Sequence, residues 1–551
     1  MKDRIEELML RFVAVRTDTG TAKERNAEAF FADWFEEVPY FREHKEYRGF
    51  FSIPDDHLSR KIPWCLRKGM GNSTVVLIHH SDCVAPDDYG ILDEASTLPW
   101  ELDAALKEGK RDIPNQVKED LFSEEWIFGL GPCDMKGGAA VQMALMEKYC
   151  QDENFHGNVV MLSVPDEENL SAGMRGGVLL LDELKSKYNL NYVLMLNSEP
   201  HGRTDNLQPV VYTGSIGKIM PVVYVRGRLA HGASAFQGLN PIALLAEIIC
   251  KTELEKDFLE EAKGVVTPPP TWLYAKDSKD VYDVSLPLSA CGYMNILTFN
   301  RTPKSIIDKL KSICENAFMD SLERMNTNHT AFLKLSGQEP HSLPWKVNVK
   351  LYEELYEEAK RESGKSFEED YATTMEKIIT DFHHNKMSLI DGINKLINKT
   401  FEYIKDDSPI VVVALAPPYY PNVANSMLKG DAVLKVNSAL NEMIDFAKTQ
   451  LGQEYQIAPY FTGISDLSYG MFVSDGDGVT ESINCIQRNM LFWTSLYYVP
   501  LETIEKLSMP VLNIGPWGKD FHKYTERVFK EDLYDKTPKL IDFMVSKVLT
   551  P

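Results

Sequence analysis

The chain has 551 residues, 44% of them hydrophobic and 25% charged, and its length predicts at least two domains because a single core seldom exceeds roughly 250 to 300 residues. The formal net charge of −22 argues against a nucleic-acid partner, since that binding depends largely on lysine and arginine. No apolar run approaches the roughly 20 residues that a membrane span needs, so no membrane partner is expected.

The N-terminal residues and the cysteines both favour a cytoplasmic protein. The first predicted element, within residues 1–18, is an amphipathic helix whose acidic residues interrupt the apolar stretch that an export signal needs. The eight cysteines are scattered, without a CxxC pair or a framework of closely spaced disulfides. We therefore expect a reducing compartment, the cytoplasm.

Four short apolar runs have the length and β-branched content of buried strands. The runs are residues 73–82, 157–168, 191–200 and 510–518. Helical patterns lie between them, for example at 139–149 and at 438–452, where Ser438 is the expected N-cap and Gly452 the expected end. This alternation predicts an α/β domain with a mostly parallel sheet and helices on both faces.

The middle of the chain predicts a smaller α+β domain inserted into the first. A strand pattern starts near Tyr212, Asn240 and Pro241 open a helix, and a second strand, turn and helix follow from Gly292. Residues 351–404 are rich in charge and predict a solvated helical insertion. The expected divisions are 1–212, 213–410 and 411–551, with “VVVALAPPYYPN” at 411–422 fitting either domain.

Ionisable residues directly follow the predicted strands. They are His79, His80 and Asp82, then Asp166, Glu167 and Glu168, then Glu199, with His522 after the fourth strand. In α/β sheets the carboxyl ends of parallel strands meet at one ligand-binding crevice. Taken singly, His80 fits a structural histidine and the acids fit an exposed turn. Together they form a mixed nitrogen and oxygen set that suits divalent metals such as zinc, and they are too many for one tetrahedral ion.

The segment “WIFGLGPCDMKGG” places Asp134 in a glycine-rich turn before a helix. Such turns usually bind phosphate, which an aspartate would repel. The third glycine of a dinucleotide-binding fingerprint is also missing. We therefore expect Asp134 to hold a cation.

Five motifs follow one another in the order “HHSD”, “GPCDMKGG”, “PDEEN”, “NSEP” and “GPWGKDFH”. The set resembles the metal motifs of the co-catalytic metallohydrolase family of aminoacylase, carboxypeptidase G and succinyl-diaminopimelate desuccinylase, over most of the chain. The length, “NILTFNRTP” and “APPYYPN” are most similar to the arginine-utilisation RocB-like branch. The segment “NLSAG” and the long loop at 88–106 depart from the family pattern, so a relative's substrate preference is not carried over.

The resemblance implies a site with two divalent ions, zinc first and cobalt or manganese as alternatives. It implies that Asp134 bridges the ions, that His80 and Glu199 bind one of them, and that Glu168 and His522 bind the other. A water held between two such ions loses a proton near neutral pH, and the ions polarise the carbonyl under attack.

The resemblance also implies roles for residues that do not bind metal. Glu167 would be the general base, and Asp82 would accept the second imidazole N–H of His80 and fix its tautomer. The inserted domain resembles the family's lid or dimerisation domain, in which His231 would polarise the scissile carbonyl; a turn histidine is the alternative.

Two weaker substrate contacts are expected. Arg301, in “NILTFNRTP”, would bind a substrate carboxylate through its guanidinium fork. Asp466, next to Ser465, either contacts substrate or belongs to an ordinary loop. The segment “SDGDG” at 474–478 lacks a complete calcium-binding loop and predicts a turn.

The implied activity is that of a cytoplasmic amidohydrolase which cleaves the amide bond of an N-acyl amino acid or small peptide. A dipeptidase or aminopeptidase with the same metals is one alternative, and a metal-binding regulatory protein without turnover is another. The expected partners are a small-molecule substrate and, through the lid domain, a second copy in a homodimer.

Overall fold

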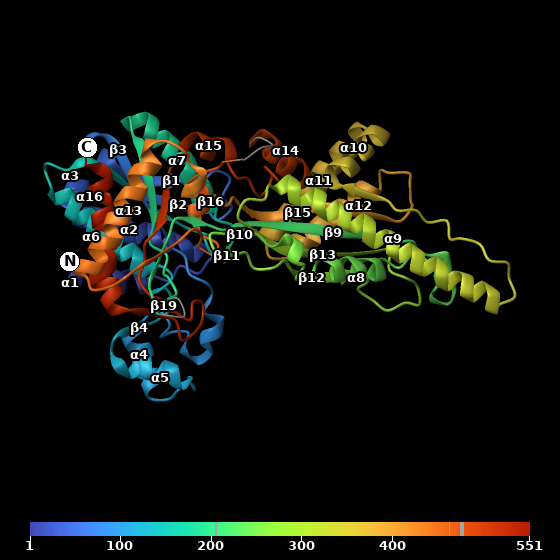
Figure 1. Ribbon diagram of the computed structural model, residues 1–551, viewed down its shortest axis with the longest axis horizontal. Coiled ribbons are helices and arrows are strands. Elements are labelled where there is room, and N and C mark those ends of the chain that lie inside the picture. Colours follow the sequence, from blue (N-terminus) through green and yellow to red (C-terminus); the bar gives the residue numbers. More distant parts are fainter. Residues whose placement is uncertain (204–206, 462, 474–478, 551) are drawn as a thin grey trace. The chain divides into compact units, whose positions relative to one another are not determined.

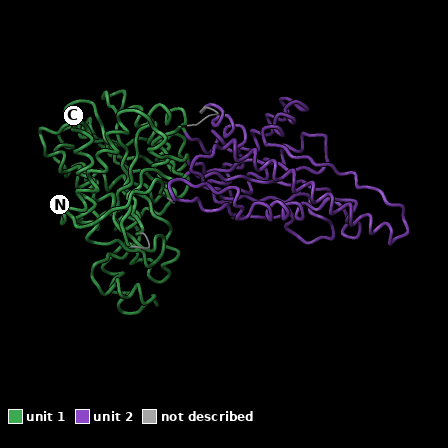
Figure 2. Tube along the Cα trace, in the orientation of Figure 1, with its two compact units in different colours: residues 1–216, 421–473, 500–551 green, residues 217–420, 474–499 purple. Residues whose placement is uncertain are grey.

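The computed structural model describes residues 1–203, 207–461, 463–473 and 479–550, which fall into two compact units (Figure 2). Unit 1 comprises residues 1–216, 421–473 and 500–551, and unit 2 comprises 217–420 and 474–499. The turn predicted at 474–478 lies outside the described residues.

The chain passes between the units at other points than the sequence predicts. β15 (Ile410–Tyr420) pairs antiparallel with β9 (Gly217–Arg226), so unit 2 extends to Tyr420 instead of residue 410. The later segment 479–499 also belongs to unit 2, where the Leu491 N–H donates to the Leu415 carbonyl. In the sheet of unit 2, β15 lies between β9 and β14, so the second boundary follows Tyr420.

Unit 1 is built on an eight-stranded sheet with the order β1-β2-β5-β3-β6-β18-β7-β17. Its centre consists of β5 (His156–Val164), β3 (Met70–His80), β6 (Asn191–Asn197) and β18 (Val511–Asn513), each parallel to its neighbour. These are the four predicted strands, and they are buried on both faces, as their continuous apolar runs indicate. The flanking strands are β1 (Arg48–Ser52), β2 (Lys61–Lys68), β7 (Val210–Tyr212) and β17 (Gln456–Ala458).

Helices cover both faces of this sheet (Figure 1). On one face, Met161 of β5 belongs to a core shared with a first group of helices, whose bounds are given at the end of this paragraph. On the other face, the next residue, Leu162, lies against Gly177 of α7 (Ala172–Tyr188). Successive strand residues face opposite sides, so the predicted α/β class is confirmed. The first group is α1 (Lys2–Val13), α2 (Asn26–Glu37), α6 (Lys136–Gln151), α13 (Asp431–Gln450) and α16 (Thr537–Leu549).

The long loop near residues 88–106 folds into a small helical layer of unit 1. Tyr89, Leu102 and Leu121 bury their side chains against Trp126 and Phe128 of a three-stranded sheet. This layer contains α4 (Pro99–Lys107) and α5 (Asn115–Ser123), and the sheet contains β4 (Trp126–Phe128), β19 (Gly518–Lys519) and β20 (Arg527–Phe529).

Unit 2 is built on a five-stranded sheet with the order β12-β13-β9-β15-β14, antiparallel except for the last pair. The charged segment predicted to be helical forms α10, α11 and α12. It is more than a solvated surface, because Phe367 and Ile393 share a buried core with Val412 of β15. The remaining bounds are β12 (Thr271–Asp277), β13 (Ser289–Thr298), β14 (Val349–Leu351), α8 (Pro241–Thr252), α9 (Pro303–Leu335), α10 (Tyr352–Ser363), α11 (Lys365–His383), α12 (Leu389–Phe401) and α14 (Val479–Asn489).

Two expectations from the sequence concern membrane-spanning helices and disulfides. Among the described residues, every helix is too short or too polar to cross a membrane. All eight cysteines lie in the described ranges, and all are free thiols.

Candidate metal centre

The five predicted metal ligands come together at the carboxyl ends of the central strands of unit 1. His80 ends β3, Glu168 follows β5, and Glu199 follows β6. Asp134 lies in the turn between β4 and α6, and His522 lies in the loop between β19 and β20. Because the central strands are parallel neighbours, side chains that are distant in sequence meet at one edge of the sheet.

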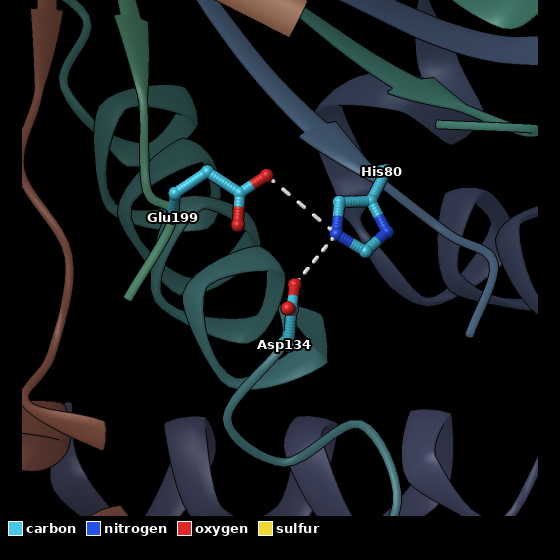
Figure 3. A group of neighbouring side chains, drawn as sticks. All are labelled: His80, Asp134 and Glu199. Atoms are coloured by element: carbon cyan, nitrogen blue, oxygen red, sulfur yellow. Dashed lines mark hydrogen bonds and ion pairs between the residues drawn. The ribbon is translucent and has the colours of Figure 1, made fainter. Parts of the chain in front are cut away.

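The two carboxylate oxygens of Asp134 face two different histidines. Asp134 Oδ1 lies 2.9 Å from His80 Nε2, and Asp134 Oδ2 lies 3.2 Å from His522 Nε2. His80 Nε2 also lies 3.6 Å from Glu199 Oε1, and Figure 3 shows this side of the centre. His522 Nε2 lies 2.9 Å from Glu168 Oε1. The arrangement therefore forms two groups of ligand atoms that share Asp134.

Each group is compact enough for one ion. The ligand atoms of His80, Asp134 and Glu199 lie within 4.8 Å of one another, as do those of Asp134, Glu168 and His522. Glu167 belongs to a third such group with His80 and Glu168. Glu167 thus lies beside the site without being needed by either of the first two groups.

The carboxylates of the centre carry more negative charge than the two histidines balance. Burial, together with nearby carboxylates, raises the pKa of Glu167 and Glu199 well above the ordinary range. The carboxylates of Asp134 and Glu168 raise the pKa of His522 to about 11. Burial would raise the pKa of Asp134, but the two histidines outweigh it and lower that pKa. A crowded set of acids of this kind attracts cations.

The donor chemistry fits divalent metal ions. Imidazole nitrogen and carboxylate oxygen are the ligands that zinc and similar ions take in proteins. Glu168 Oε1 is buried and has no hydrogen-bond partner among the described residues, although it lies 2.9 Å from His522 Nε2. An imidazole nitrogen and a carboxylate oxygen at this distance can bind the same ion.

The contact of Asp82 with His80 differs from the prediction. His80 Nδ1 lies 3.0 Å from the backbone carbonyl oxygen of Asp82 and 3.7 Å from its carboxylate. The carboxylate instead accepts the backbone N–H groups of Glu167 at 3.1 Å and Glu168 at 3.2 Å. These two N–H groups occupy both carboxylate oxygens, so the carbonyl is left to orient the imidazole. Asp82 therefore links His80 to the two adjacent glutamates Glu167 and Glu168, the acidic pair.

Glu526 is a site residue that the sequence analysis misses. Its buried carboxylate accepts the backbone N–H groups of Gly131 at 2.8 Å and of Cys133 and Asp134 at 3.3 Å. Burial raises the pKa of Glu526 to about 8. Gly131 has φ +90°, a conformation that favours glycine. A single acid in “TERVF” carries no local signal, since only the fold brings it under the turn that holds Asp134.

Asp466 and Ser465 are buried beside the centre. The side chain of Asp466 is 2% exposed, and neither of its carboxylate oxygens reaches solvent. Burial raises the pKa of Asp466 to about 7, and its charge in turn helps to raise that of Glu167. Asp466 therefore influences the pKa of Glu167, and its contact with substrate remains a prediction.

His231 and Arg301 lie in unit 2. The His231 side chain is exposed, and its Nδ1 accepts the Ala233 N–H at 3.1 Å, which leaves Nε2 to carry the proton of the neutral ring. Arg301 Nη2 donates to the Asp257 carbonyl at 2.8 Å, and the Arg301 backbone N–H donates to Glu260. The guanidinium of Arg301 thus already donates one hydrogen bond, whereas Nε2 of the exposed His231 ring is accessible to a further partner.

Comparison with known proteins finds similarity along the whole chain. A sequence profile described as Peptidase family M20/M25/M40 matches residues 105–419. The uncharacterized protein YqjN of Bacillus subtilis (strain 168) is 30% identical over 553 residues, which cover 100% of this chain and 97% of that protein. Protein RocB of the same organism is 27% identical over 553 residues, which cover 98% of this chain and 94% of RocB.

The fold also has solved counterparts. The M20 family metallo-carboxypeptidase Sso-CP2 from Sulfolobus solfataricus matches 100% of both chains with a TM-score of 0.51 and 12% identity. The aminopeptidase PepT from Bacillus cereus ATCC 10987 covers 100% of this chain and 99% of its own, with a TM-score of 0.50 and 13% identity. At such identities the likeness shows the fold alone. The profile, by contrast, matches this chain in sequence over more than half of its length, and YqjN matches it over the whole length, which includes all five motifs.

Proposed function

This chain belongs to peptidase family M20/M25/M40 and is therefore a hydrolase, and we propose that it cleaves the amide bond of an N-acyl amino acid or small peptide. We propose two divalent cations as its cofactors, with zinc as the first candidate and cobalt or manganese as alternatives. His80, Asp134 and Glu199 would hold one cation, and Asp134, Glu168 and His522 the other.

The observation that carries the proposal is the placement of Asp134. Each of its carboxylate oxygens faces its own histidine, at 2.9 Å and 3.2 Å, and each histidine has a second carboxylate beside it. A carboxylate that bound one ion would not need a histidine beside each of its two oxygens. When bound, two cations lower the pKa of a water between them and polarise the substrate carbonyl.

Glu167 is the proposed general base. It lies next to both groups of ligand atoms and belongs to neither, so it remains available to take a proton from water and to pass it to the leaving amine. Burial and the neighbouring carboxylates raise its pKa, which would make it a stronger base than an exposed glutamate. Asp82 holds its backbone N–H, so the base starts from a fixed backbone position.

His231 is the proposed donor to the carbonyl oxygen of the substrate. Its Nδ1 accepts the Ala233 N–H, so the neutral ring presents Nε2–H as a donor. Charge that develops on the carbonyl oxygen during attack is stabilised by such a donor. Arg301 remains a proposed contact for the substrate carboxylate, after release of the Asp257 carbonyl.

The substrate class is tested with purified protein that has been loaded with zinc. The panel should contain N-acetyl and N-succinyl amino acids and free dipeptides, and product release should be measured for each. Hydrolysis of the acylated compounds supports the proposal, whereas hydrolysis of free dipeptides alone would make the protein a dipeptidase. A fully loaded protein that is inactive on all of them would favour a regulatory role.

Two further proposals concern where and how the protein works. Its eight free thiols support a reducing compartment such as the cytoplasm. A homodimer through unit 2 follows from the resemblance of that unit to a lid or dimerisation domain. Sedimentation of the full chain tests the second proposal, which a monomer at micromolar concentration would contradict.

A further inference from the structure

A buried ion cluster lies behind the acidic pair of unit 1. Arg60, directly before β2, has a side chain that is 4% exposed and contacts three carboxylates. Its guanidinium nitrogens lie 2.8 Å from Glu24 Oε1, 2.6 Å from Asp56 Oδ1 and 2.7 Å from Asp166 Oδ1. Buried ion pairs are weak evidence for stability, because the loss of hydration offsets much of their attraction. A buried cluster of this size therefore suggests another role.

Asp166 connects this cluster to the metal centre. It precedes Glu167 and Glu168 in the chain, and its second carboxylate oxygen accepts the Ala172 N–H at 3.0 Å. The Asp166 carbonyl accepts the Ser171 N–H at 2.7 Å. Asp166 has φ +70°, a left-handed conformation that non-glycine residues adopt only when their surroundings hold them there. The turn at 166–171 is thus tied to itself through Asp166 and to Arg60 behind it.

The acidic pair is therefore held from two sides. The Asp82 carboxylate binds the two backbone N–H groups of Glu167 and Glu168. Arg60 binds the side chain of the preceding residue, Asp166. Neither Arg60 nor Asp166 is among the groups whose ligand atoms converge on the metal centre, so an effect of either residue on the centre would pass through the turn.

We propose that Arg60 is a positioning residue, which acts through Asp166 to fix the turn that carries the base Glu167 and the metal ligand Glu168. The inference rests on the proposed function for the roles of those two glutamates. Residues that support metal ligands in this indirect way typically contribute 10- to 100-fold, an order-of-magnitude range, to metal affinity or activity.

The geometry of the arginine side chain suits this position. A guanidinium presents five N–H donors in a planar fork, so one side chain reaches three carboxylates, whereas a lysine ammonium is a compact charge with three donors. Burial alone would lower the pKa of Arg60, but the charges of Asp166, Asp56 and Glu24 outweigh it and raise that pKa. Arg60 therefore remains charged at every pH at which an enzyme would work.

The test compares Arg60→Met and Arg60→Lys with a matched control, Arg67→Met. Arg67 is also a buried arginine, 6% exposed on β2, but its guanidinium donates to backbone carbonyls, including that of Tyr149 at 2.9 Å. In the zinc-loaded enzyme we expect Arg60→Met to lower kcat about tenfold or more with little change in KM. Arg60→Lys should lie between this variant and the wild type, and Arg67→Met should lower Tm without a selective loss of kcat.

Zinc affinity supplies a readout that does not depend on turnover. Competition with a chromophoric chelator should show that Arg60→Met weakens one of the two zinc affinities about tenfold or more, the one that depends on Glu168, and leaves the other within about threefold. Arg67→Met should leave both unchanged. If Arg60→Met folds with wild-type kcat and both wild-type zinc affinities, the proposal is overturned.

A triple variant separates positioning from charge balance. Arg60→Met leaves buried carboxyl groups without their cation. Burial raises the pKa of Glu24 to about 9, so Asp56→Asn is added to remove a charge and Glu24→Gln to keep that position neutral. We expect Tm to recover in the triple variant while kcat and the weakened zinc affinity stay low, because Asp166 still lacks the guanidinium of Arg60 as its partner. Recovery of all three quantities would overturn the proposal. If the wild type binds two zinc ions but hydrolyses nothing on the panel, the proposed function fails, while the zinc affinities still test Arg60.

Discussion

The two halves of the candidate metal centre share Asp134 but are built differently. On one side, His80 ends one central strand and Glu199 follows another, and their side chains are 1% and 7% exposed. On the other side, Glu168 is 8% exposed, but His522 lies on a loop and is 46% exposed. A strand end is fixed by the hydrogen bonds of the sheet, whereas a loop residue depends on its local contacts. We therefore expect the first half to be preformed and the second to be assembled around Asp134 and Glu168.

The largest effect is expected from the residue that both halves share. Asp134→Ala removes one ligand from each group, so we expect both metals to be lost and hydrolysis to fall at least about a thousandfold. Metal content per chain, measured by elemental analysis after gel filtration, checks this. A variant that retains two tightly bound ions would show that the halves are independent and that Asp134 does not bridge them.

Loss of the general base should lower activity without loss of either metal. Glu167→Gln keeps the size of the side chain and removes its basicity, so we expect kcat to fall about 10²- to 10⁴-fold while both metals stay bound. The measurement is kcat together with metal content on the same preparation. Full activity in this variant would remove Glu167 from the mechanism, and loss of a metal would instead make Glu167 a ligand.

The two histidines should respond unequally to substitution. His80→Ala leaves a cavity and unpaired carboxylates in the interior, so we expect it to lose metal and also to lower Tm by several degrees. His522→Ala acts at an exposed position, so we expect it to lose one metal with a Tm within about two degrees of the wild type in metal-free protein. Equal losses of Tm in the two metal-free variants would contradict the difference between the halves.

The smallest effect on the zinc affinities is expected from Glu526, which holds the turn that carries Asp134. Glu526→Gln retains a carbonyl oxygen that accepts the backbone N–H groups of Gly131, Cys133 and Asp134, so we expect both zinc affinities to fall by only about threefold. Glu526→Ala should lower both further and by similar factors, because the turn serves both halves. Chelator competition checks this, and a loss confined to one zinc affinity would show that Glu526 acts elsewhere.

The parts of the fold with a local signal could be predicted from sequence. The four buried strands are continuous apolar runs, and their ionisable ends meet because parallel neighbours share one edge. The helix predicted at 438–452 overlaps α13, but α13 starts at Asp431, so Ser438 lies inside the helix and the prediction that it caps the start is wrong. The true start has no side-chain cap that would mark it in the sequence. Gly452 does follow the end of this helix, at φ +64°.

The supporting residues of the site could not be predicted, because their partners are distant in sequence. Glu526 lies 392 to 395 residues along the chain from the backbone N–H groups that it accepts, and Arg60 lies 106 residues from Asp166. Neither belongs to a spaced motif. The passage of β15 into unit 2 has the same cause, since an apolar strand fits any sheet until its pairing partner is known.

The central claim is that Asp134 joins two metal ions, one in each half of the centre. The direct measurement is a crystal structure of the zinc-loaded protein with anomalous diffraction recorded at the zinc edge. We expect two peaks roughly 3.5 to 4 Å apart, one beside His80 and Glu199 and one beside Glu168 and His522, each in contact with one oxygen of Asp134. A single peak, or two peaks of which one lies away from Asp134, would contradict the account.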